Sequence, residues 1–165
     1  MPAYATSGSN SLTPNTTPPT VLYPGDDKYL FGTSVAAGTP PTPGQVQAPN
    51  DSNVVAEAVV VGERSISVQL APSPGGGAVP GCIVQVTASA NPGAAEIDVQ
   101  DAAVDADGAY ITPTSSASYK ITAWTQNGAV WTAYAELQPE GGRFISLKVI
   151  ANPNAVSFTA KIAYV

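Results

Sequence analysis

From Asn53 onward, short runs of alternating apolar and polar residues are separated by Gly, Pro, Asn and Asp, and no run has helical spacing. The last run is the clearest, because one of its faces is formed by Val156, Phe158, Ala160, Ile162 and Tyr164. The runs predict strands at 54–61, 65–70, 82–90, 95–100, 109–112 merging toward 119–125, 129–137, 144–150 and 156–165. The pattern indicates an all-β fold, an antiparallel β-sandwich of about eight strands, Ig-like or jelly-roll-like.

Turn signals predict part of the strand pairing. The Asn-Gly dipeptide at 127–128 provides the two positive-φ residues of a type I′ hairpin turn, which places Trp124 directly opposite Trp131. Further turn signals at 139–142 and 151–154 predict a C-terminal meander of four consecutive strands.

The first third of the chain has a different composition. Residues 1–50 contain nine of the sixteen prolines and three charged residues, so we expect an extended Pro-rich N-terminal arm at 1–50, with the sandwich domain at 51–165. The arm is either a disordered tail with accidental aromatic residues or a segment that docks onto its own domain or a neighbour. In the second case its expected interface residues are Tyr4, Val21, Leu22, Tyr23, Tyr29, Leu30 and Phe31.

Composition and charge exclude several classes of protein. Twelve acids against six bases give a net charge of −6, which disfavours binding to a nucleic-acid backbone. With no His and one Cys, the chain has no Ser-His or Cys-His nucleophile pair, no His-containing zinc site and no intrachain disulfide. We therefore expect no catalytic residue, no metal site and no cofactor. Neither a signal sequence nor a membrane-spanning run is present, so we expect synthesis in the cytoplasm and no membrane partner.

Carboxylates and one thiol are the remaining chemical groups of interest. The segment 105–108, Asp-Ala-Asp-Gly, matches a calcium loop only in part and is more simply explained as a tight turn. Glu96 and Asp98 are two apart on a predicted strand and are expected on its solvated face. Cys82 begins an apolar strand face and is expected to be a buried, inert thiol.

The tryptophans are the candidate contact residues of the domain. Trp124 and Trp131 form either part of the core or an exposed patch. The other face of the same hairpin is expected to carry Ile121, Val130 and Tyr134, so both faces have apolar content. A sheet that is apolar on both faces suggests that one face meets a partner.

The plan of the whole chain resembles that of tailed-phage capsid decoration or cement proteins. The similarity lies in a Met-Pro start, an Ala/Thr/Gly/Pro-rich arm, an acidic His-free β domain and a last strand that runs to Val165. Separately, Asp105, Gly108 and Tyr110, followed by Tyr119 and Ile121, are similar to a pattern in carboxypeptidase-regulatory-like and other immunoglobulin-like sandwich modules.

The resemblance implies a virion structural protein without enzymatic activity. It would bind the major capsid protein and stabilise the shell through its sandwich and arm, as a homo-oligomer, commonly a trimer in proteins of this kind, on the capsid surface. The alternative is a carbohydrate- or host-surface-binding module of a fibre or tail appendage, which would use Trp124 and Trp131.

Overall fold

The computed structural model describes residues 20–38, 40–41, 46–48, 51–71, 81–102, 119–137 and 144–165. Every helix or strand assigned within these ranges is a β-strand. The strands are β1 (Thr20–Leu22), β2 (Asp27–Phe31), β3 (Thr33–Ser34), β4 (Gln47–Ala48), β5 (Asp51–Val55), β6 (Glu57–Ala58), β7 (Val68–Leu70), β8 (Cys82–Ala88), β9 (Glu96–Ala102), β10 (Tyr119–Ile121), β11 (Thr125–Asn127), β12 (Val130–Leu137), β13 (Phe144–Ala151) and β14 (Ser157–Tyr164).

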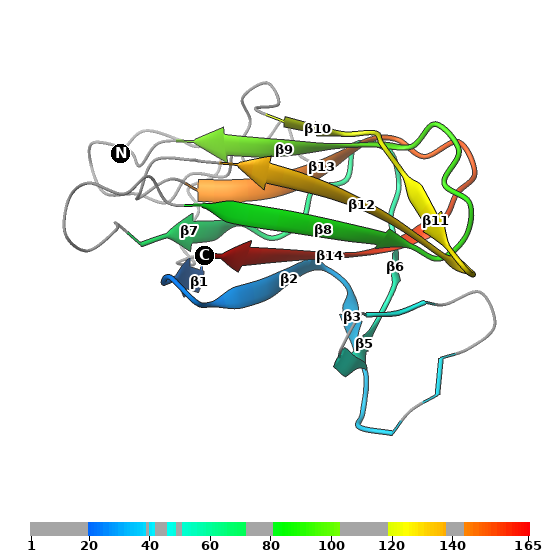
Figure 1. Ribbon diagram of the computed structural model, residues 1–165, viewed down its shortest axis with the longest axis horizontal. Coiled ribbons are helices and arrows are strands. Elements are labelled where there is room, and N and C mark those ends of the chain that lie inside the picture. The colour runs from blue at the N-terminus through cyan, green and yellow to red at the C-terminus, as the bar shows by residue number, and fades with distance from the viewer. Residues whose placement is uncertain are drawn as a thin grey trace.

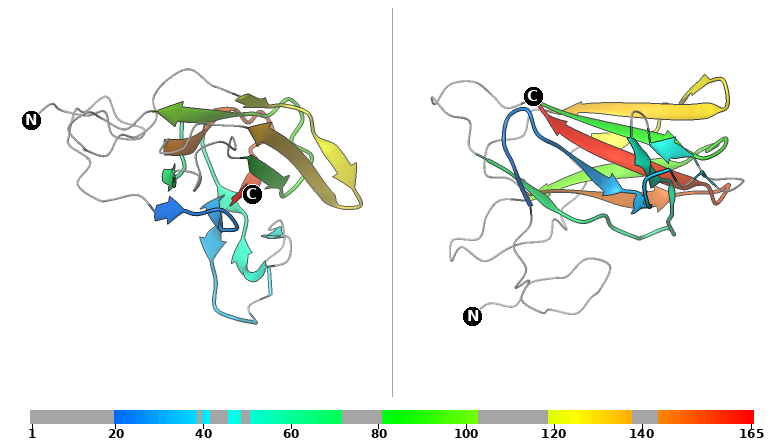
Figure 2. Two further views of the ribbon diagram at one scale, coloured as in Figure 1. Left: turned by 60° about the vertical axis from the view of Figure 1, so that its left-hand side comes forward. Right: turned by 90° about the horizontal axis from the view of Figure 1, so that it is seen from below.

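Two sheets pack face to face (Figure 1). The five-stranded sheet has the order β1-β7-β13-β9-β10, and the six-stranded sheet has the order β11-β12-β8-β14-β2, with β6 also paired to β14. The right-hand view of Figure 2 shows the two layers from below. Strands β3, β5 and β4 form a small third sheet beside β2. The predicted all-β sandwich is confirmed.

The core lies between the two large sheets and is built from alternate residues of the long strands. In β14, Phe158, Ala160 and Ile162 are fully buried, as the alternation predicts. Ile162 lies opposite Val84 of β8, which lies in turn opposite Ala135 of β12, so one row of apolar side chains crosses three strands. Burial of such rows, at about 25 cal/mol per Å² of apolar surface, is the main source of stability.

The first described residues belong to the sandwich, so the predicted boundary at residue 50 is too late. Strand β1 pairs with β7, β2 pairs with β14, and Leu22, Leu30 and Phe31 are buried in the core. The turn between these strands contains Pro24 and Gly25, and Gly25 has the positive φ of 96° that a type II turn requires. The two apolar islands of the proline-rich segment form edge strands, one in each large sheet. Residues 1–19 lie outside the described residues.

The C-terminal end of the last strand is held by this same turn. The Gly25 N–H donates to the Tyr164 carbonyl at 2.7 Å, and the Tyr164 N–H donates to the Asp26 carbonyl at 2.9 Å. The buried Tyr164 hydroxyl donates to the Ala71 carbonyl at 2.9 Å and so joins β14 to the end of β7 in the opposite sheet.

The predicted C-terminal meander is wrong. Strand β10 belongs to the five-stranded sheet, and the chain crosses at 122–124 before β11 begins in the other sheet. Strands β12, β13 and β14 then alternate between the two sheets. Asn152 closes the turn after β13, since its side chain accepts from the Val156 N–H at 3.1 Å and donates to the Val156 carbonyl at 2.9 Å. Turn residues mark where the chain reverses, whereas side-chain burial decides which sheet receives the next strand.

Candidate binding surfaces

Trp124 and Trp131 both lie partly buried against the core, but they do not face each other as predicted. The hairpin loop is shifted by one residue, so Asn127 pairs with Val130 and Gln126, not Trp124, lies opposite Trp131. Positive φ is found at Gly128 but not at Asn127, which matches a type II′ turn with Gly in the first loop position.

The Trp124 indole is used inside the molecule. Its ring stacks on Phe158 with centroids 5.8 Å apart and an interplanar angle of 25°. Its Nε1–H donates to the Ala95 carbonyl at 3.0 Å. Because one ring face and the ring N–H are already occupied, Trp124 is not an open aromatic platform.

The expected arm residues divide into buried and exposed groups. Leu22, Leu30 and Phe31 are buried in the core of their own sandwich, which corresponds to docking on the chain's own domain and leaves these three side chains covered. Val21 and Tyr23 are exposed, and Tyr29 is half-buried. Tyr29 lies beneath Lys161, whose Nζ is 5.2 Å from the ring centroid. Tyr4 lies outside the described residues.

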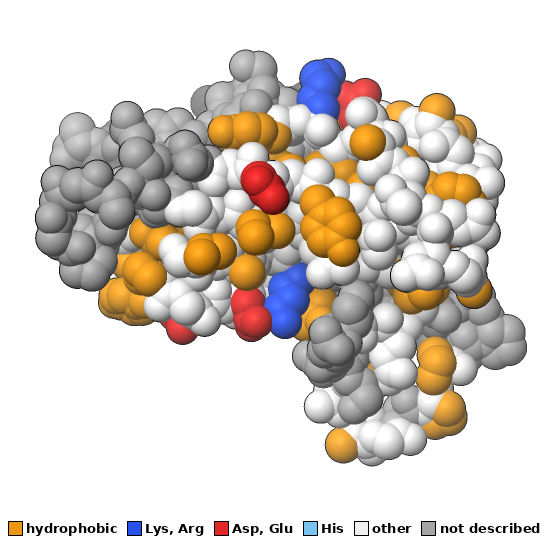
Figure 3. Space-filling view, viewed as in Figure 1, with side chains coloured by type: hydrophobic (Ala, Val, Ile, Leu, Met, Phe, Trp, Pro, Cys, Tyr) orange, Lys and Arg blue, Asp and Glu red, His pale blue; other side chains and the backbone are white. Residues whose placement is uncertain are grey.

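The outer face of the six-stranded sheet exposes apolar and aromatic side chains. Tyr134 of β12 is 59% exposed and lies opposite Gln85 of β8, whose Nε2 donates to the Tyr134 hydroxyl at 3.3 Å. Ile83, 38% exposed, lies on the same face two residues away. Figure 3 shows this side of the molecule, where hydrophobic side chains outnumber charged ones. The prediction that Tyr134 lies on the outer face is therefore confirmed. The prediction that Ile121 lies on the same face is wrong, because Ile121 is buried and belongs to the other sheet.

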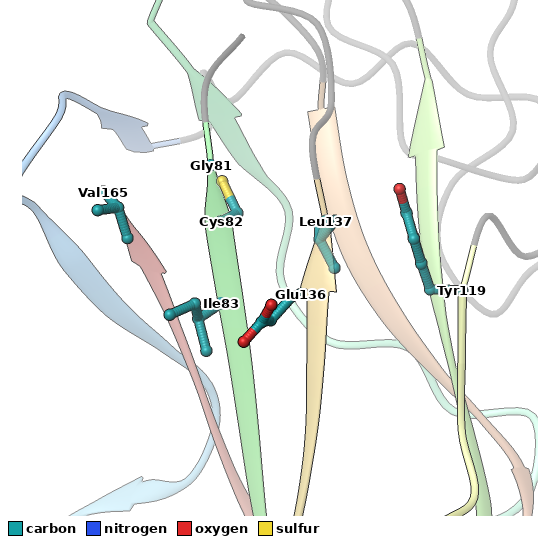
Figure 4. A pocket seen from close by; sticks show the side chains of 7 residues that line it. All are labelled: Gly81, Cys82, Ile83, Tyr119, Glu136, Leu137 and Val165. Carbon is teal, nitrogen blue, oxygen red and sulfur yellow. The ribbon is translucent and has the colours of Figure 1, made fainter.

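A hollow of about 490 Å³ lies beside this face, at the end of the sandwich (Figure 4). Its walls come from the start of β8, the ends of β12 and β14, and β10, and they are formed by Gly81, Cys82, Ile83, Tyr119, Glu136, Leu137 and Val165. The walls combine apolar side chains with the Glu136 carboxylate and with polar backbone.

Cys82 has no nucleophilic character in this hollow. Its side chain is buried as predicted, and burial raises the pKa of the thiol to about 11. A thiol with this pKa is protonated at neutral pH, and the thiolate is the reactive form.

The outer face of the five-stranded sheet carries a row of charged residues that sequence reasoning missed. Lys120 of β10 and Lys148 of β13 lie on either side of Asp98 of β9, and Arg64 lies beyond Lys148. Beside the row, the Lys120 Nζ donates to Glu96 Oε1 at 2.8 Å. Strand register brings the row together, and alternation within each strand could not reveal it.

Asp98 does not lie on a solvated face as predicted, since it is 7% exposed. Burial, followed by the hydrogen bond and the charge of Glu96, raises the pKa of Asp98. The hydrogen bond from Lys120 lowers the pKa of Glu96.

Other polar groups on this face are also covered. Asp98 Oδ1, Gln100 Oε1 and Ser146 Oγ are buried and have no hydrogen-bond partner among the described residues. Gln100 and Ser146 lie directly opposite each other on β9 and β13. A strand pattern shows which side chains share a face, but not what covers that face.

Searches for metal-binding groups, membrane-spanning helices and similar proteins gave three negative findings. In the described ranges no three His, Cys, Asp or Glu side chains are grouped as a metal site requires, and the 105–108 turn lies outside those ranges. None of the described elements is a helix with the length and hydrophobicity of a membrane crossing. Comparisons with family models, curated proteins and solved structures find no match to this chain.

Proposed function

We propose that the protein is a virion structural protein, a capsid decoration or cement protein that binds the assembled shell without catalysing a reaction. The observation that carries the proposal is the outer face of the six-stranded sheet, where Tyr134 and Ile83 are exposed. Interface cores are enriched in aromatic residues and interface rims are polar, which fits Tyr134 with the charged Glu136 and Lys161 beside it.

The mechanism is adhesion by burial of apolar surface. Each Å² of apolar surface that Tyr134, Ile83 and the neighbouring hollow bury against the major capsid protein contributes about 25 cal/mol before the costs of association are subtracted. Many copies on one shell, or several chains in one homo-oligomer, add through effective concentration. No cofactor takes part, and a buried Cys82 thiol with a pKa of about 11 is consistent with a protein that performs no thiol chemistry.

A carbohydrate-binding role is less well supported. Sugar rings bind on open aromatic faces. One face of the Trp124 ring is stacked on Phe158, and its ring N–H donates to the Ala95 carbonyl. Strong binding on a glycan array that is lost in Trp131→Ala would favour this alternative over the capsid role.

The capsid role is tested by sedimentation with capsid particles, stripped of this protein, from the phage that encodes it. The full chain should pellet with the particles, and Tyr134→Ala should weaken its binding about tenfold or more, the usual effect at an aromatic hot spot. Ile150→Ser, which changes an exposed side chain on β13 of the other sheet, is the matched control. Failure of the unaltered protein to bind particles, or equal binding by Tyr134→Ala, would contradict the proposal.

A further inference from the structure

The turn between β11 and β12 contains the chain's single Asn-Gly pair. Asn127 is the last residue of β11 and Gly128 is the first residue of the two-residue loop, and both are exposed. The tip of this hairpin projects at one end of the sandwich (Figure 2). In an Asn-Gly pair the glycine nitrogen can approach the asparagine amide carbon closely, because glycine has no Cβ.

Neither of the two groups that would react is held by a hydrogen bond. Within the described residues, the Asn127 side-chain amide and the Gly128 N–H form none, although the Gly128 carbonyl accepts from Gln126 Nε2 at 3.0 Å. Apart from the chain neighbours, no atom lies within 4 Å of the position that a Cβ would take at Gly128. The amide of Asn127 and the backbone nitrogen that follows it are therefore free to meet.

The other asparagines of the described ranges are protected. Asn91 and Asn152 each precede a proline, whose backbone nitrogen carries no hydrogen. The Asn154 Nδ2 is engaged, since it donates to the Asn91 carbonyl at 3.0 Å. Asn53 lies within β5 and precedes a β-branched valine, which crowds the backbone nitrogen. Asn127 alone among them combines exposure, an unbonded amide and a following glycine.

We propose that Asn127 is a site of spontaneous deamidation in the folded protein. The Gly128 nitrogen forms a bond to Asn127 Cγ, the Cγ–Nδ2 bond breaks, and the amide leaves as ammonia with the proton from the Gly128 nitrogen. The product is a five-membered succinimide ring. Water then adds to one of the two ring carbonyls and breaks its bond to the nitrogen, which yields aspartate or isoaspartate at position 127.

The two products affect the hairpin differently. Both add one carboxylate to a chain whose net charge is −6. Isoaspartate also places an additional carbon atom in the main chain, directly beside the loop that joins Asn127 to Val130. Because loop length sets the register of a hairpin, we expect this product to disturb the pairing of Gln126 with Trp131, which packs against the core. The modification therefore alters one end of the six-stranded sheet irreversibly.

The experiment incubates the full-length protein at neutral and at mildly alkaline pH. Peptide mapping by mass spectrometry measures the exchange of the amide NH2 for a hydroxyl at each asparagine, and methylation by a protein isoaspartyl methyltransferase detects isoaspartate. Asn127→Gln lengthens the side chain and so disfavours ring closure, while Gly128→Ala hinders the attacking nitrogen. Asn154, read in the same digests, is the matched control residue. A synthetic peptide of residues 123–131 gives the conversion without the fold.

We expect Asn127 to be converted to both products, faster at the higher pH because the attacking nitrogen must lose its proton. Conversion at this position should be lost in Asn127→Gln and reduced in Gly128→Ala. An unmodified Asn127 under conditions that convert the peptide would overturn the proposal, since the folded turn would then prevent ring closure. Equal conversion of Asn154, or undiminished conversion in Gly128→Ala, would also overturn it. Because the assay uses no capsid, its outcome is independent of the capsid role.

Discussion

The packing of Phe158 between the two sheets allows a quantitative test of the fold. Phe158 is fully buried on β14, pairs in register with Ala88 of β8, and stacks on Trp124 with ring centroids 5.8 Å apart. Phe158→Ala removes the ring and leaves a cavity, because surrounding backbone held in two sheets relaxes only partly.

The expected loss follows from these contacts. Truncation of a buried Phe costs about 3–5 kcal/mol, and loss of the aromatic pair with Trp124 adds about 0.5–1.5 kcal/mol. We therefore expect Phe158→Ala to lower the free energy of unfolding by about 3.5–6.5 kcal/mol. In a chain of this length the loss corresponds to a fall in Tm of about 10–20 °C.

Urea unfolding followed by tryptophan fluorescence measures this loss, and Trp124 is one of the two tryptophans that emit. The emission of the folded variant should shift to longer wavelength, because Trp124 loses the ring that covers one of its faces. Tyr134→Ala is the matched control, since it truncates an exposed aromatic residue on the same sheet and should change stability by about 0.5 kcal/mol or less. A loss below about 1.5 kcal/mol in Phe158→Ala, the range of well-tolerated core substitutions, would refute the proposed packing.

Three further predictions concern single contacts. Asp98 has a raised pKa in the folded state, so the stability it contributes is present at low pH and is lost as pH rises through that pKa. The Asp98→Asn side chain cannot ionise. In urea titrations, the free energy of unfolding of Asp98→Asn should therefore rise relative to that of the unaltered protein between acidic and neutral pH. Tyr164→Phe leaves the Ala71 carbonyl without its buried donor and should cost about 1–3 kcal/mol in thermal unfolding, with no cost indicating that water replaces the hydroxyl. Gly128 has a φ of 65° in the β11–β12 turn and open space around it, so an added side chain would strain only the backbone. Gly128→Ala should therefore lower the free energy of unfolding by about 1–2 kcal/mol. An unchanged unfolding midpoint would contradict this turn.

Local pattern was sufficient to predict most strands of the domain. Alternation located β8, β9, β12, β13 and β14 within two residues at either end, because each strand buries one face and a two-residue period records this burial directly. The buried thiol of Cys82 and the exposed side chain of Tyr134 follow from the same periodicity.

The early strands were concealed by composition, although a local signal was present. Proline-rich sequence suggested a separate arm, but Pro24 and Gly25 between two apolar islands form the turn that returns β2 along β14. A Pro-Gly pair flanked by apolar residues could have indicated this turn.

By itself, therefore, the sequence determined the fold class, the positions of most strands and the direction in which their side chains face, since these depend on neighbours along the chain. The tertiary structure alone decided which sheet each strand joins, the one-residue shift that separates Trp124 from Trp131, and the alignment of Arg64, Lys148, Asp98 and Lys120 across the sheet. Those features depend on contacts between residues far apart in sequence, and two-residue periodicity carries no information about which distant strand is the partner.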